Sequence, residues 1–533
     1  MTTTSTPKTI KRLIACCDGT WMDSDNGYDE PGLLRKEGAL QIPSNVTRIS
    51  RCFEKRCSDG KLQVVNYESG VGTGSNVLDS ITGGAFGQGL AERMRETYSF
   101  LCANYMDGDE IILVGFSRGA FTVRSVAGMI GNIGLLTREG VEFFYPIFKD
   151  MQHWMDDGYE DPFPNIPFPD KPKGKDAADE YRARLEQLGY TRVRREQGQG
   201  DLITIKAVGV WDTVGSLGIP RVACTFKWHD TNLSDRIEHA FQALALDETR
   251  PPFTPAVWER LPENKYTTDL RQVWFPGNHA NCGGGWEDQG IANCTLAWMM
   301  DQLASIGVEF DLPALERCFF QTAKFYHKTQ TGRLSLKSKK KRKKETMRQW
   351  AVNPIYKNNY PFRPWGLGAI KKAPGLLYKL SGQTIRTPGL YRPTDPKSKR
   401  DGTRFLQDTN ERIHSTVRIR LACKGLSLND AHVWDCPALL DNWKLKRTRD
   451  KYNDPVPFLP GWCPKGGHDS IGHPSEWSKG RWVWEYVGSE KNAPSDKRQR
   501  VMVEEPLGPY ERYLLNLSAG TPNIYHFADT VEF

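Results

Sequence analysis

A buried strand that turns into a helix through a glycine-flanked serine is the feature that most constrains this chain. Residues 110–130 read EIILVGFSRGAFTVRSVAGMI. The run IILV shows no polar alternation, as expected of a strand buried on both faces of a parallel sheet. Gly115 and Gly119 flank Ser117, and apolar residues at helical spacing follow. A strand, a tight turn and a helix in this order predict a nucleophile elbow, with Ser117 at the carboxyl edge of a sheet.

Strand and helix patterns alternate over residues 8–135. RLIACC and LQVVNYE read as strands, and GLAERMRETYSFLCANY as a helix. PSNVTRISRCFEKRC also has helical spacing, at Val46, Ile49 and Phe53, with Ser44 or Asn45 as its cap. This alternation predicts an α/β fold of the α/β-hydrolase kind, a mostly parallel sheet flanked by helices.

The middle of the chain predicts further elements of the same fold. Residues 150–200 begin with a proline-rich stretch and end in a charged helix, which we interpret as an insertion or lid over the core. Strand character returns at 201–212 and 270–279. Between them, SDRIEHAFQALALDE, residues 234–248, has the spacing of an amphipathic helix.

The length of 533 residues leaves room for more than one unit. We expect a catalytic domain over residues 8–330, with the insertion at about 150–200. Residues 331–533 form a basic C-terminal region, rich in tryptophan and proline and with few long periodic segments. Its role does not follow from its composition, and neither do the protein partners or the oligomeric state of the chain.

The charge of the chain is mild and its excess is local. The 72 basic and 64 acidic residues give a net charge of +8, which does not by itself indicate nucleic-acid binding. The run KSKKKRKK, residues 337–344, is the exception. We interpret it as a solvated loop, with a nuclear-import signal or a peripheral contact to anionic membranes as alternatives.

Targeting signals and metal motifs do not appear in the sequence. The apolar patch Leu13–Cys17 runs straight into a motif and reads as a first strand, not as a signal peptide. No apolar run is long enough to cross a bilayer. The 12 cysteines form no C-x-x-C pair, so we expect no zinc site and mostly reduced thiols. These features predict an intracellular, cytoplasmic protein without a metal.

A serine nucleophile needs a base and an acid that orients the base. Asp212 ends the strand-like segment ITIKAVGVW, and His279 follows VWFPGN and precedes a glycine run. The order serine, acid, histidine is that of α/β-hydrolases. The separations, 95 residues from Ser117 to Asp212 and 67 more to His279, leave room for crossover helices. We therefore predict Ser117, Asp212 and His279 as a catalytic triad.

Rival residues are placed less favourably. Asp247, in LALDETRPPF, is the alternative acid, although a role in pinning its loop fits it better. The other histidines lie before any suitable acid, within predicted helices or polar segments, or in the irregular C-terminal region: His153, His229, His239, His327, His414, His432, His468, His473 and His526.

An oxyanion hole is expected from two backbone N–H groups. One belongs to Arg118, the residue after the nucleophile. The segment CCDGTW supplies the second, from Gly19 or Thr20, and Asp18 could tie this loop through its own backbone amides, as an ordinary turn would also do. The glycines of SGVGTGSN do not match the dinucleotide fingerprint and no Walker lysine follows, so we expect no cofactor.

The motifs together resemble a known family. CCDGTW, SNVTRI, GVGTG, GFSRGAFTVR, GVWDTVGSLG, ALALDETRPPF and WFPGNHANCGGGW follow one another as in the catalytic domain of type VI secretion phospholipase effectors, a domain long described as one of unknown function. The resemblance covers about residues 8–330. It implies an α/β-hydrolase with phospholipase or ester-hydrolase activity, and its serine, acid and histidine fall on Ser117, Asp212 and His279.

One position departs from the family pattern. Members usually read H-S-D-V-G-G-G, whereas this chain has Asn281 in place of the aspartate. If that aspartate supports the imidazolium, activity here is weaker; if it only holds the loop, little changes.

The motifs and the resemblance together lead to one hypothesis, a serine esterase or phospholipase of lipid metabolism that acts on a lipid or small ester. The alternative is a catalytically silent interaction or regulatory protein on a hydrolase scaffold.

Overall fold

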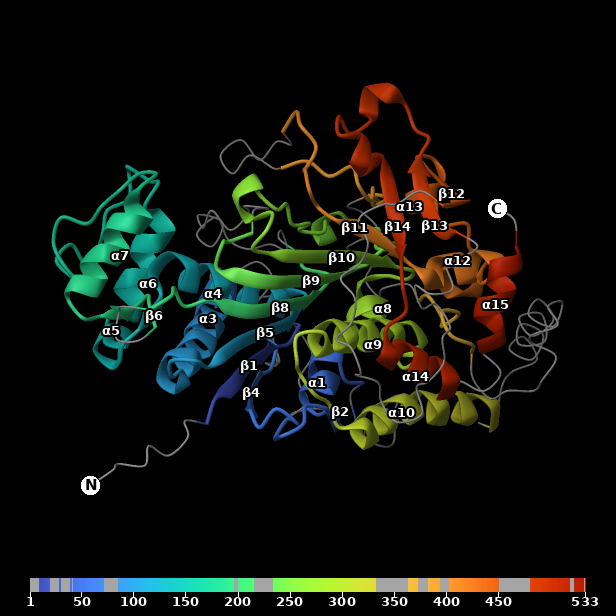
Figure 1. Cartoon of the computed structure of the whole chain (residues 1–533), viewed down its shortest axis with the longest axis horizontal. Helices are drawn as coiled ribbons and strands as arrows, with labels where there is room; N and C mark the ends of the chain where they lie inside the picture. The colour runs from blue at the N-terminus through green and yellow to red at the C-terminus, as the bar shows by residue number, and fades with distance from the viewer. Residues whose placement is uncertain are drawn as a thin grey trace.

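A single large sheet organises the protein (Figure 1). The structure, a computed structural model, describes residues 9–19, 28–29, 39–40, 42–70, 85–195, 200–214, 233–331, 363–371, 382–393, 402–449, 480–517, 522–531 and 533. Across the sheet the strands lie in the order β12 (Trp443–Thr448), β13 (Arg481–Tyr486), β14 (Val501–Glu505), β11 (Glu411–His414), β10 (Asp269–Phe275), β9 (Ile237–Ala245), β8 (Ile205–Trp211), β5 (Glu110–Phe116), β1 (Lys11–Cys17) and β4 (Leu62–Glu68). From β4 to β14 every neighbouring pair is parallel, and β12–β14 are antiparallel. The predicted α/β fold is confirmed.

Helices cover both faces of this sheet. One face carries α1 (Asn45–Ser50), α8 (His279–Gly283), α9 (Gly290–Ala304), α10 (Leu312–Thr331), α14 (Pro509–Leu517) and α15 (Pro522–Thr530). The other face carries α3 (Ala85–Asn104), α4 (Arg118–Ile133), α6 (Phe144–His153) and α7 (Ala177–Gln187). The smaller elements are α5 (Arg138–Glu142), α12 (Ser415–Ala422), α13 (Pro437–Leu440) and the strand pairs β2 (Tyr28–Asp29) with β3 (Ala39–Leu40) and β6 (Leu135–Leu136) with β7 (Thr191–Arg192).

The absence of polar alternation in the central strands follows from these two layers. In β1, Leu13 and Ala15 belong to the core beneath α3 and α4, whereas Ile14 and Cys16 belong to the core beneath α1 and α9. All four side chains are fully buried. A strand covered on both faces needs apolar residues at every position, so an unbroken apolar run is the expected pattern.

The predicted helix at 234–248 is wrong, because this segment forms strand β9. The strand lies between β8 and β10 and pairs in parallel with both of them. Its residues from Ala240 to Ala245 are all buried. Ile237, Ala240, Phe241 and Leu244 have helical spacing by coincidence, since a strand with two buried faces accepts apolar residues at any spacing.

The helix predicted around residues 45–57 is shorter than its pattern. Helix α1 ends at Ser50, and Ser44 caps its start by accepting a hydrogen bond from the backbone N–H of Thr47. Phe53 lies beyond the helix and pairs with Phe310 through an isolated bridge and stacked rings. Backbone bonds to residues 309–311 therefore replace those that a longer helix would make.

The insertion lies at the amino edge of the strands. Helix α4 runs back from Ser117 to Ile133, so the segment that follows it begins at the edge opposite the serine. Helix α7 packs against α4, and α5 packs against α3. Figure 1 shows α5, α6 and α7 together at the left end of the molecule. The described residues of the insertion therefore lie beside α3 and α4.

The described C-terminal residues extend the same sheet. Strand β11 pairs with β10, and β14 pairs with β11. Helix α14 packs against α9, where the carboxylate of Asp301 accepts the backbone N–H groups of Tyr510 and Glu511. Residues beyond 400 thus share one hydrophobic core with residues before 330.

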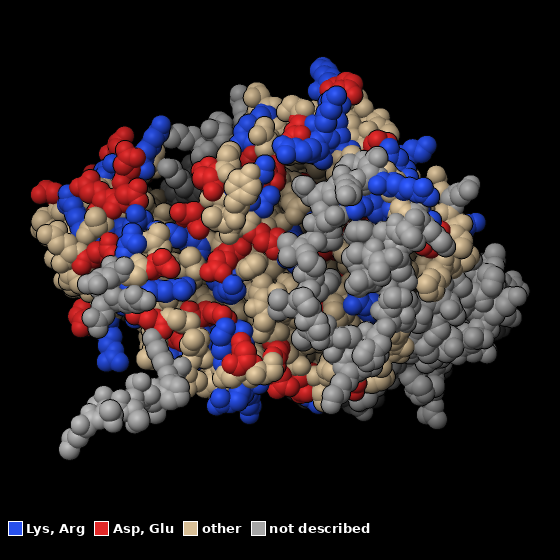
Figure 2. Space-filling view, in the orientation of Figure 1, with Lys and Arg blue, Asp and Glu red and all other residues tan. Residues whose placement is uncertain are grey.

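Charged side chains of both signs occur on the face shown in Figure 2. Lysine and arginine are interspersed there with aspartate and glutamate among the other described residues. The basic run 337–344 lies outside the described residues. Among the helices that the structure describes, none is long and apolar enough to span a membrane.

Candidate active site

Ser117 stands at the turn between β5 and α4. Its backbone has φ 57° and ψ −117°, a conformation that is strained for a residue other than glycine. Its N–H donates to the carbonyl of Trp211 at the end of β8, at 3.1 Å. The turn is tight enough that a Cβ on Gly119 would lie 2.0 Å from the carbonyl oxygen of Cys17. This is the strand–turn–helix geometry that the glycine-flanked serine predicts.

His279 is the first residue of helix α8 and reaches Ser117 directly. Its Nε2 lies 2.7 Å from the Ser117 Oγ, and its Nδ1 lies 2.6 Å from Oδ2 of Asp212. The imidazole packs between the rings of Phe116 and Phe253, with centroid distances of 4.7 and 4.9 Å. The two aromatic rings restrict its rotation, so both ring nitrogens stay aimed at their partners.

Asp212 follows β8 and is completely buried. Its φ of 42° turns the chain sharply after the strand, as at Ser117. The Oδ1 atom accepts the backbone N–H of Ala245 at 3.0 Å. Burial alone would raise the pKa of Asp212, but Arg386 and His279 outweigh burial and hold the pKa well below its usual range. The carboxylate is therefore ionised when it faces the imidazole.

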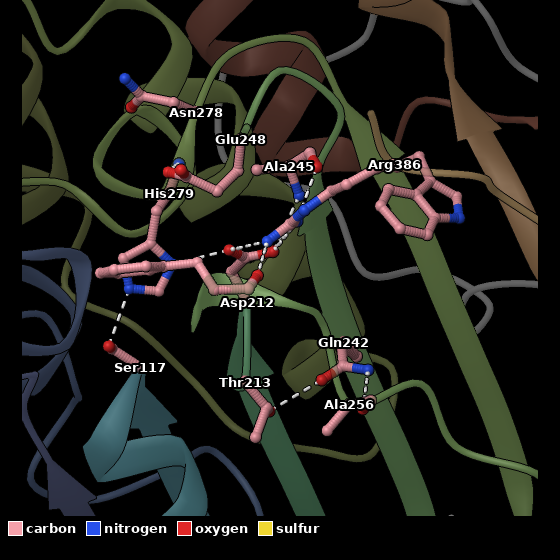
Figure 3. A network of polar contacts seen from close by, with 12 residues as sticks. Ser117, Asp212, Thr213, Gln242, Ala245, Glu248, Ala256, Asn278, His279 and Arg386 are labelled. Carbon is pink, nitrogen blue, oxygen red and sulfur yellow. Dashed lines mark hydrogen bonds and ion pairs between the residues drawn. The ribbon is translucent and has the colours of Figure 1, made fainter. Parts of the chain in front are cut away.

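Arg386 is the partner that the sequence did not reveal. It comes from the C-terminal region, is buried, and grips both oxygens of Asp212, with NH1–Oδ1 at 2.5 Å and NH2–Oδ2 at 3.0 Å. Figure 3 shows the contacts running from Ser117 through His279 and Asp212 to Arg386. An arginine in the loop-like stretch TIRTPG carries no sequence signal that would single it out.

Asn281 closes the first turn of the helix that bears His279. Its Oδ1 accepts the N–H of Asn278, and the Asn278 side chain accepts the N–H of Asn281 in return. Its Nδ2 donates to the carbonyl of Ala369 at 2.9 Å. An aspartate could not make this last bond, because it has no N–H to donate. In this chain the residue therefore ties the helix start to the segment at Ala369.

Asp247 and Glu248 hold the neighbouring loops. Asp247 accepts the N–H of Gly277 at 2.6 Å and the indole N–H of Trp434 at 2.7 Å, so the rival acid pins a loop, as its position predicts. Glu248 is buried, pairs with Arg250 and accepts the backbone N–H of His279 at 3.3 Å. Sequence reasoning missed Glu248, which lies beside the more conspicuous Asp247.

The structure describes two of the three predicted oxyanion donors, Arg118 and Gly19, and both lie next to the serine. Arg118 begins helix α4, directly after Ser117. Gly19 lies against the serine, since a Cβ on it would be 3.3 Å from the Ser117 Cβ, but its N–H donates to its neighbour Asp18 at 2.7 Å. Thr20 lies outside the described residues.

Asp18 anchors the loop after β1. Its Oδ2 accepts the hydroxyls of Ser44, Thr47 and Tyr67, at 2.6, 2.7 and 2.9 Å. Burial raises the pKa of Asp18 to about 6, although these hydrogen bonds act against the rise. The described start of this loop, Asp18 and Gly19, follows the carboxyl end of β1, and the strand order switches there from β4 on one side of β1 to β5 on the other. Such a switch point is where open α/β sheets bind ligands.

The described residues hold no group of three or more histidine, cysteine, aspartate or glutamate side chains that could bind a metal ion. The ten described cysteines are all buried.

The comparison with protein families decides the family. A family model described as "T6SS, Phospholipase effector Tle1-like, catalytic domain" matches residues 11–302, more than half of the 533 residues. The chain belongs to this family. The Tle1-like match includes Ser117, Asp212 and His279 and ends before Arg386. The resemblance seen in the motifs is confirmed.

Individual relatives of this Tle1-like chain are distant. An uncharacterized protein of Saccharomyces cerevisiae is 25% identical over 277 residues, which are 47% of this chain and 33% of the relative. A solved structure of an uncharacterized protein from Pseudomonas aeruginosa is 16% identical, with a TM-score of 0.34, and the match covers 65% of this chain and 54% of that one. The structure of the Tle1 effector bound to the VgrG spike of the type VI secretion system is 18% identical, with a TM-score of 0.27 and coverage of 53% and 52%. The chain thus spans about a third to just over half of the length of these relatives.

Proposed function

We propose that this protein is a serine hydrolase that cleaves carboxylic esters of lipids through an acyl-enzyme. Ser117 is the nucleophile, His279 the general base and Asp212 the acid that orients it. The observation that carries the proposal is the unbroken path from the Ser117 Oγ through the imidazole to the Asp212 carboxylate, with distances of 2.7 and 2.6 Å. Both distances are within the range of strong hydrogen bonds.

The proposed reaction has two halves. His279 Nε2 takes the proton of Ser117 while the Oγ attacks the ester carbonyl, whose electron pair moves onto its oxygen. Collapse of this tetrahedral intermediate expels the alcohol, which receives the proton from His279. Water then gives a proton to the same nitrogen and attacks the acyl-enzyme. The carboxylic acid leaves and the proton returns to Ser117.

The oxyanion of the intermediate needs donors that are already in place. We assign one to the backbone N–H of Arg118, at the positive end of helix α4. The second comes from the loop after β1, which Asp18 holds against the serine. Because the N–H of Gly19 already donates to Asp18, Thr20 is the other donor of the predicted pair.

The lipid part of the proposal rests on the Tle1-like family, and the ester chemistry rests on the three side chains. The three proposed catalytic side chains lie within residues 8–330, and the C-terminal region completes the unit that holds them. A peripheral contact with an anionic membrane fits the net charge of +8.

Labelling with a fluorophosphonate probe tests the proposal. Wild-type protein should form a covalent adduct that maps to Ser117, and Ser117→Ala should lose it, because only an activated serine attacks the probe. Ser50→Ala is the matched control, since the Ser50 hydroxyl donates to the Thr47 carbonyl in another helix. Incubation with a panel of phospholipids and simple esters, read by mass spectrometry, then defines the substrate.

Two results contradict the proposal. If wild-type protein does not label, or if Ser117→Ala labels equally, the chain is a non-catalytic scaffold. If simple esters are cleaved and no phospholipid is, the serine hydrolase stands and the lipid assignment fails.

A further inference from the structure

We propose that Arg386 is a positioning residue of the active site, supplied by the part of the chain beyond the residues that the family model matches. The proposal rests on the proposed function, because it assigns a role in the same reaction. Arg386 lies 84 residues past the end of the match at residue 302, by subtraction. The catalytic unit is then incomplete without a segment of the C-terminal region.

The guanidinium of Arg386 donates through both of its terminal nitrogens. NH1 donates to Asp212 Oδ1 at 2.5 Å and to the carbonyl of Ala245 at 2.6 Å. NH2 donates to Asp212 Oδ2 at 3.0 Å and to the carbonyl of Phe253 at 2.7 Å. Ala245 and Phe253 precede and follow the loop that carries Glu248. One planar group therefore fixes the carboxylate and both ends of this loop.

This arrangement fixes which carboxylate oxygen faces the imidazole. Oδ1 accepts hydrogen bonds from Nη1 of Arg386 and from the Ala245 N–H. This leaves Oδ2 to accept the hydrogen bond from Nδ1 of His279, at 2.6 Å. A carboxylate that could rotate would lose this bond part of the time, and His279 would then lose its orientation toward Ser117. Bidentate arginine–carboxylate pairs supply this kind of directional hold.

Arg386 also balances charge at a buried position. Asp212 is fully buried and Arg386 is 4% exposed, so neither charge is stable there without the other. The other charged pair beside His279 is Glu248 with Arg250. The guanidinium partly offsets the attraction of the Asp212 carboxylate for a protonated imidazole.

The segment that delivers Arg386 is itself anchored to the sheet. Ahead of the arginine, the N–H of Thr384 donates to the carbonyl of Thr249 at 3.0 Å. After it, the N–H of Gly389 donates to Glu411 of β11 at 2.8 Å, and the indole of Trp443 in β12 donates to the Pro388 carbonyl at 3.1 Å. Strands of the C-terminal region therefore set the position of the arginine, which sets the position of the acid.

Three variants of the full chain test the inference. Arg386→Gln removes the charge and the fork. Arg386→Lys keeps the charge but cannot hold two carboxylate oxygens and two carbonyls at once. Arg418→Gln is the matched control, because Arg418 is another fully buried arginine of the C-terminal region, held by both oxygens of Glu504 at 2.7 and 2.8 Å.

Two measurements separate positioning from folding. The first is kcat and KM for a simple ester over a pH series. The second is the NMR titration of the His279 ring in protein labelled with ¹³C-histidine, assigned with His279→Gln. We expect Arg386→Gln to lower kcat about tenfold or more with KM within about threefold, since loss of alignment acts on the reacting atoms. We also expect the acid limb of the pH profile and the ring titration to move to higher pH by about half a unit or more. Arg386→Lys should lose kcat and keep the midpoint.

Each outcome decides a separate point. If Arg386→Gln matches Arg418→Gln in both kcat and titration midpoint, the inference is overturned. If Arg386→Gln does not fold, Arg386→Lys decides, and a wild-type kcat in that variant overturns the need for the fork. If wild-type protein neither labels at Ser117 nor cleaves an ester, the proposed function fails. The ring titration then still reports whether Arg386 controls the charge of the imidazole.

Discussion

Two residues at the centre of the site hold backbone conformations that side chains other than glycine seldom adopt. Ser117 has φ 57° and Asp212 has φ 42°, and both directly follow a strand of the sheet. Such conformations cost about 1–3 kcal/mol each and persist where the surroundings enforce them. Here the enforcing contacts are the bonds to Trp211 and Ala245. Strain of this kind commonly occurs at functional sites, and it supports the roles that we propose for both residues.

Asp18 makes the stability of the protein depend on pH in a defined direction. Its pKa of about 6 in the folded protein lies above the value of about 3.9 for an unfolded aspartate. The folded state therefore holds the proton more tightly, and this contribution to stability is complete below about pH 4. It is lost as the pH rises to about 6. We expect wild-type protein to lose about 2 kcal/mol relative to Asp18→Asn between pH 4 and pH 7.

Urea unfolding of both proteins at each pH measures this difference. Asp176→Asn is the control, because Asp176 is exposed and its side chain makes no capping hydrogen bond to helix α7. Its difference from wild-type protein should stay constant across the series. A constant difference for Asp18→Asn as well would show that burial does not govern the Asp18 carboxyl.

Strand ends explain why three of the site residues could be predicted. Ser117 and Asp212 directly follow apolar strand ends and His279 follows β10 after a short turn, and parallel strands bring such positions to one edge. Arg386 could not be predicted, because nothing in the local sequence distinguishes an arginine that is buried from one that is exposed. Only its contacts across 174 residues of sequence reveal its role. The consequence of Asn281 also needed the structure, since its bond to Ala369 joins separate parts of the chain.

At the scale of elements, the helix–strand confusion at β9 has a physical origin. The segment has alanine at three of its nine positions, and alanine favours helices. Pairing with β8 and β10 satisfies every backbone bond in the sheet centre and overrides that preference. Strands β1, β4 and β5 were predicted correctly. Each contains β-branched and aromatic residues or an unbroken apolar run, and both patterns are typical of strands.

The crossing of helix α4 over β1 depends on Gly119. A Cβ there would lie 2.0 Å from the Cys17 carbonyl oxygen and 2.6 Å from that of Asp18, and backbone atoms cannot move aside cheaply. We expect Gly119→Ala to lower the free energy of unfolding by at least about 3 kcal/mol and to slow probe labelling of Ser117. Thermal and denaturant unfolding measure the first effect.

Gly158→Ala is the control for this substitution. The nearest atom to a Cβ at Gly158 is 3.6 Å away, in the side chain of Asp156, so the change should stay within about 0.5 kcal/mol. Equal stability of the two variants would mean that α4 can shift away from β1, contrary to the packing described above.

At the scale of the whole molecule, the C-terminal region completes the central sheet that the earlier strands begin. Strand β11 covers the edge of β10, and the indole N–H of Trp298 in α9 donates to Glu505 at the end of β14. These strands were hard to predict because β11 has four residues and β14 five, too few for a periodic pattern. Their position in the sheet follows from pairing over long distances along the chain.

A chain that ends at residue 330 should therefore fail to fold as a monomer. It would expose the edge of β10 and the buried face of α9, and exposed edges and apolar faces lead to aggregation. Size-exclusion chromatography of the truncated and full chains, with probe labelling of each, checks this. A monodisperse truncated chain that labels at Ser117 would establish residues 8–330 as an independent domain and would contradict the expectation.

The distance along the chain between Arg386 and the residues that it supports has a consequence for synthesis. Ribosomes synthesise a chain from its N-terminus at about 5–20 residues per second. Residue 386 follows residue 279 by 107 positions, so the arginine is added about 5–20 s after the histidine. During that interval the nascent chain carries the proposed nucleophile and base without the arginine that we propose aligns them. The proposed site therefore reaches its full alignment only after residue 386 has been added and has paired with Asp212.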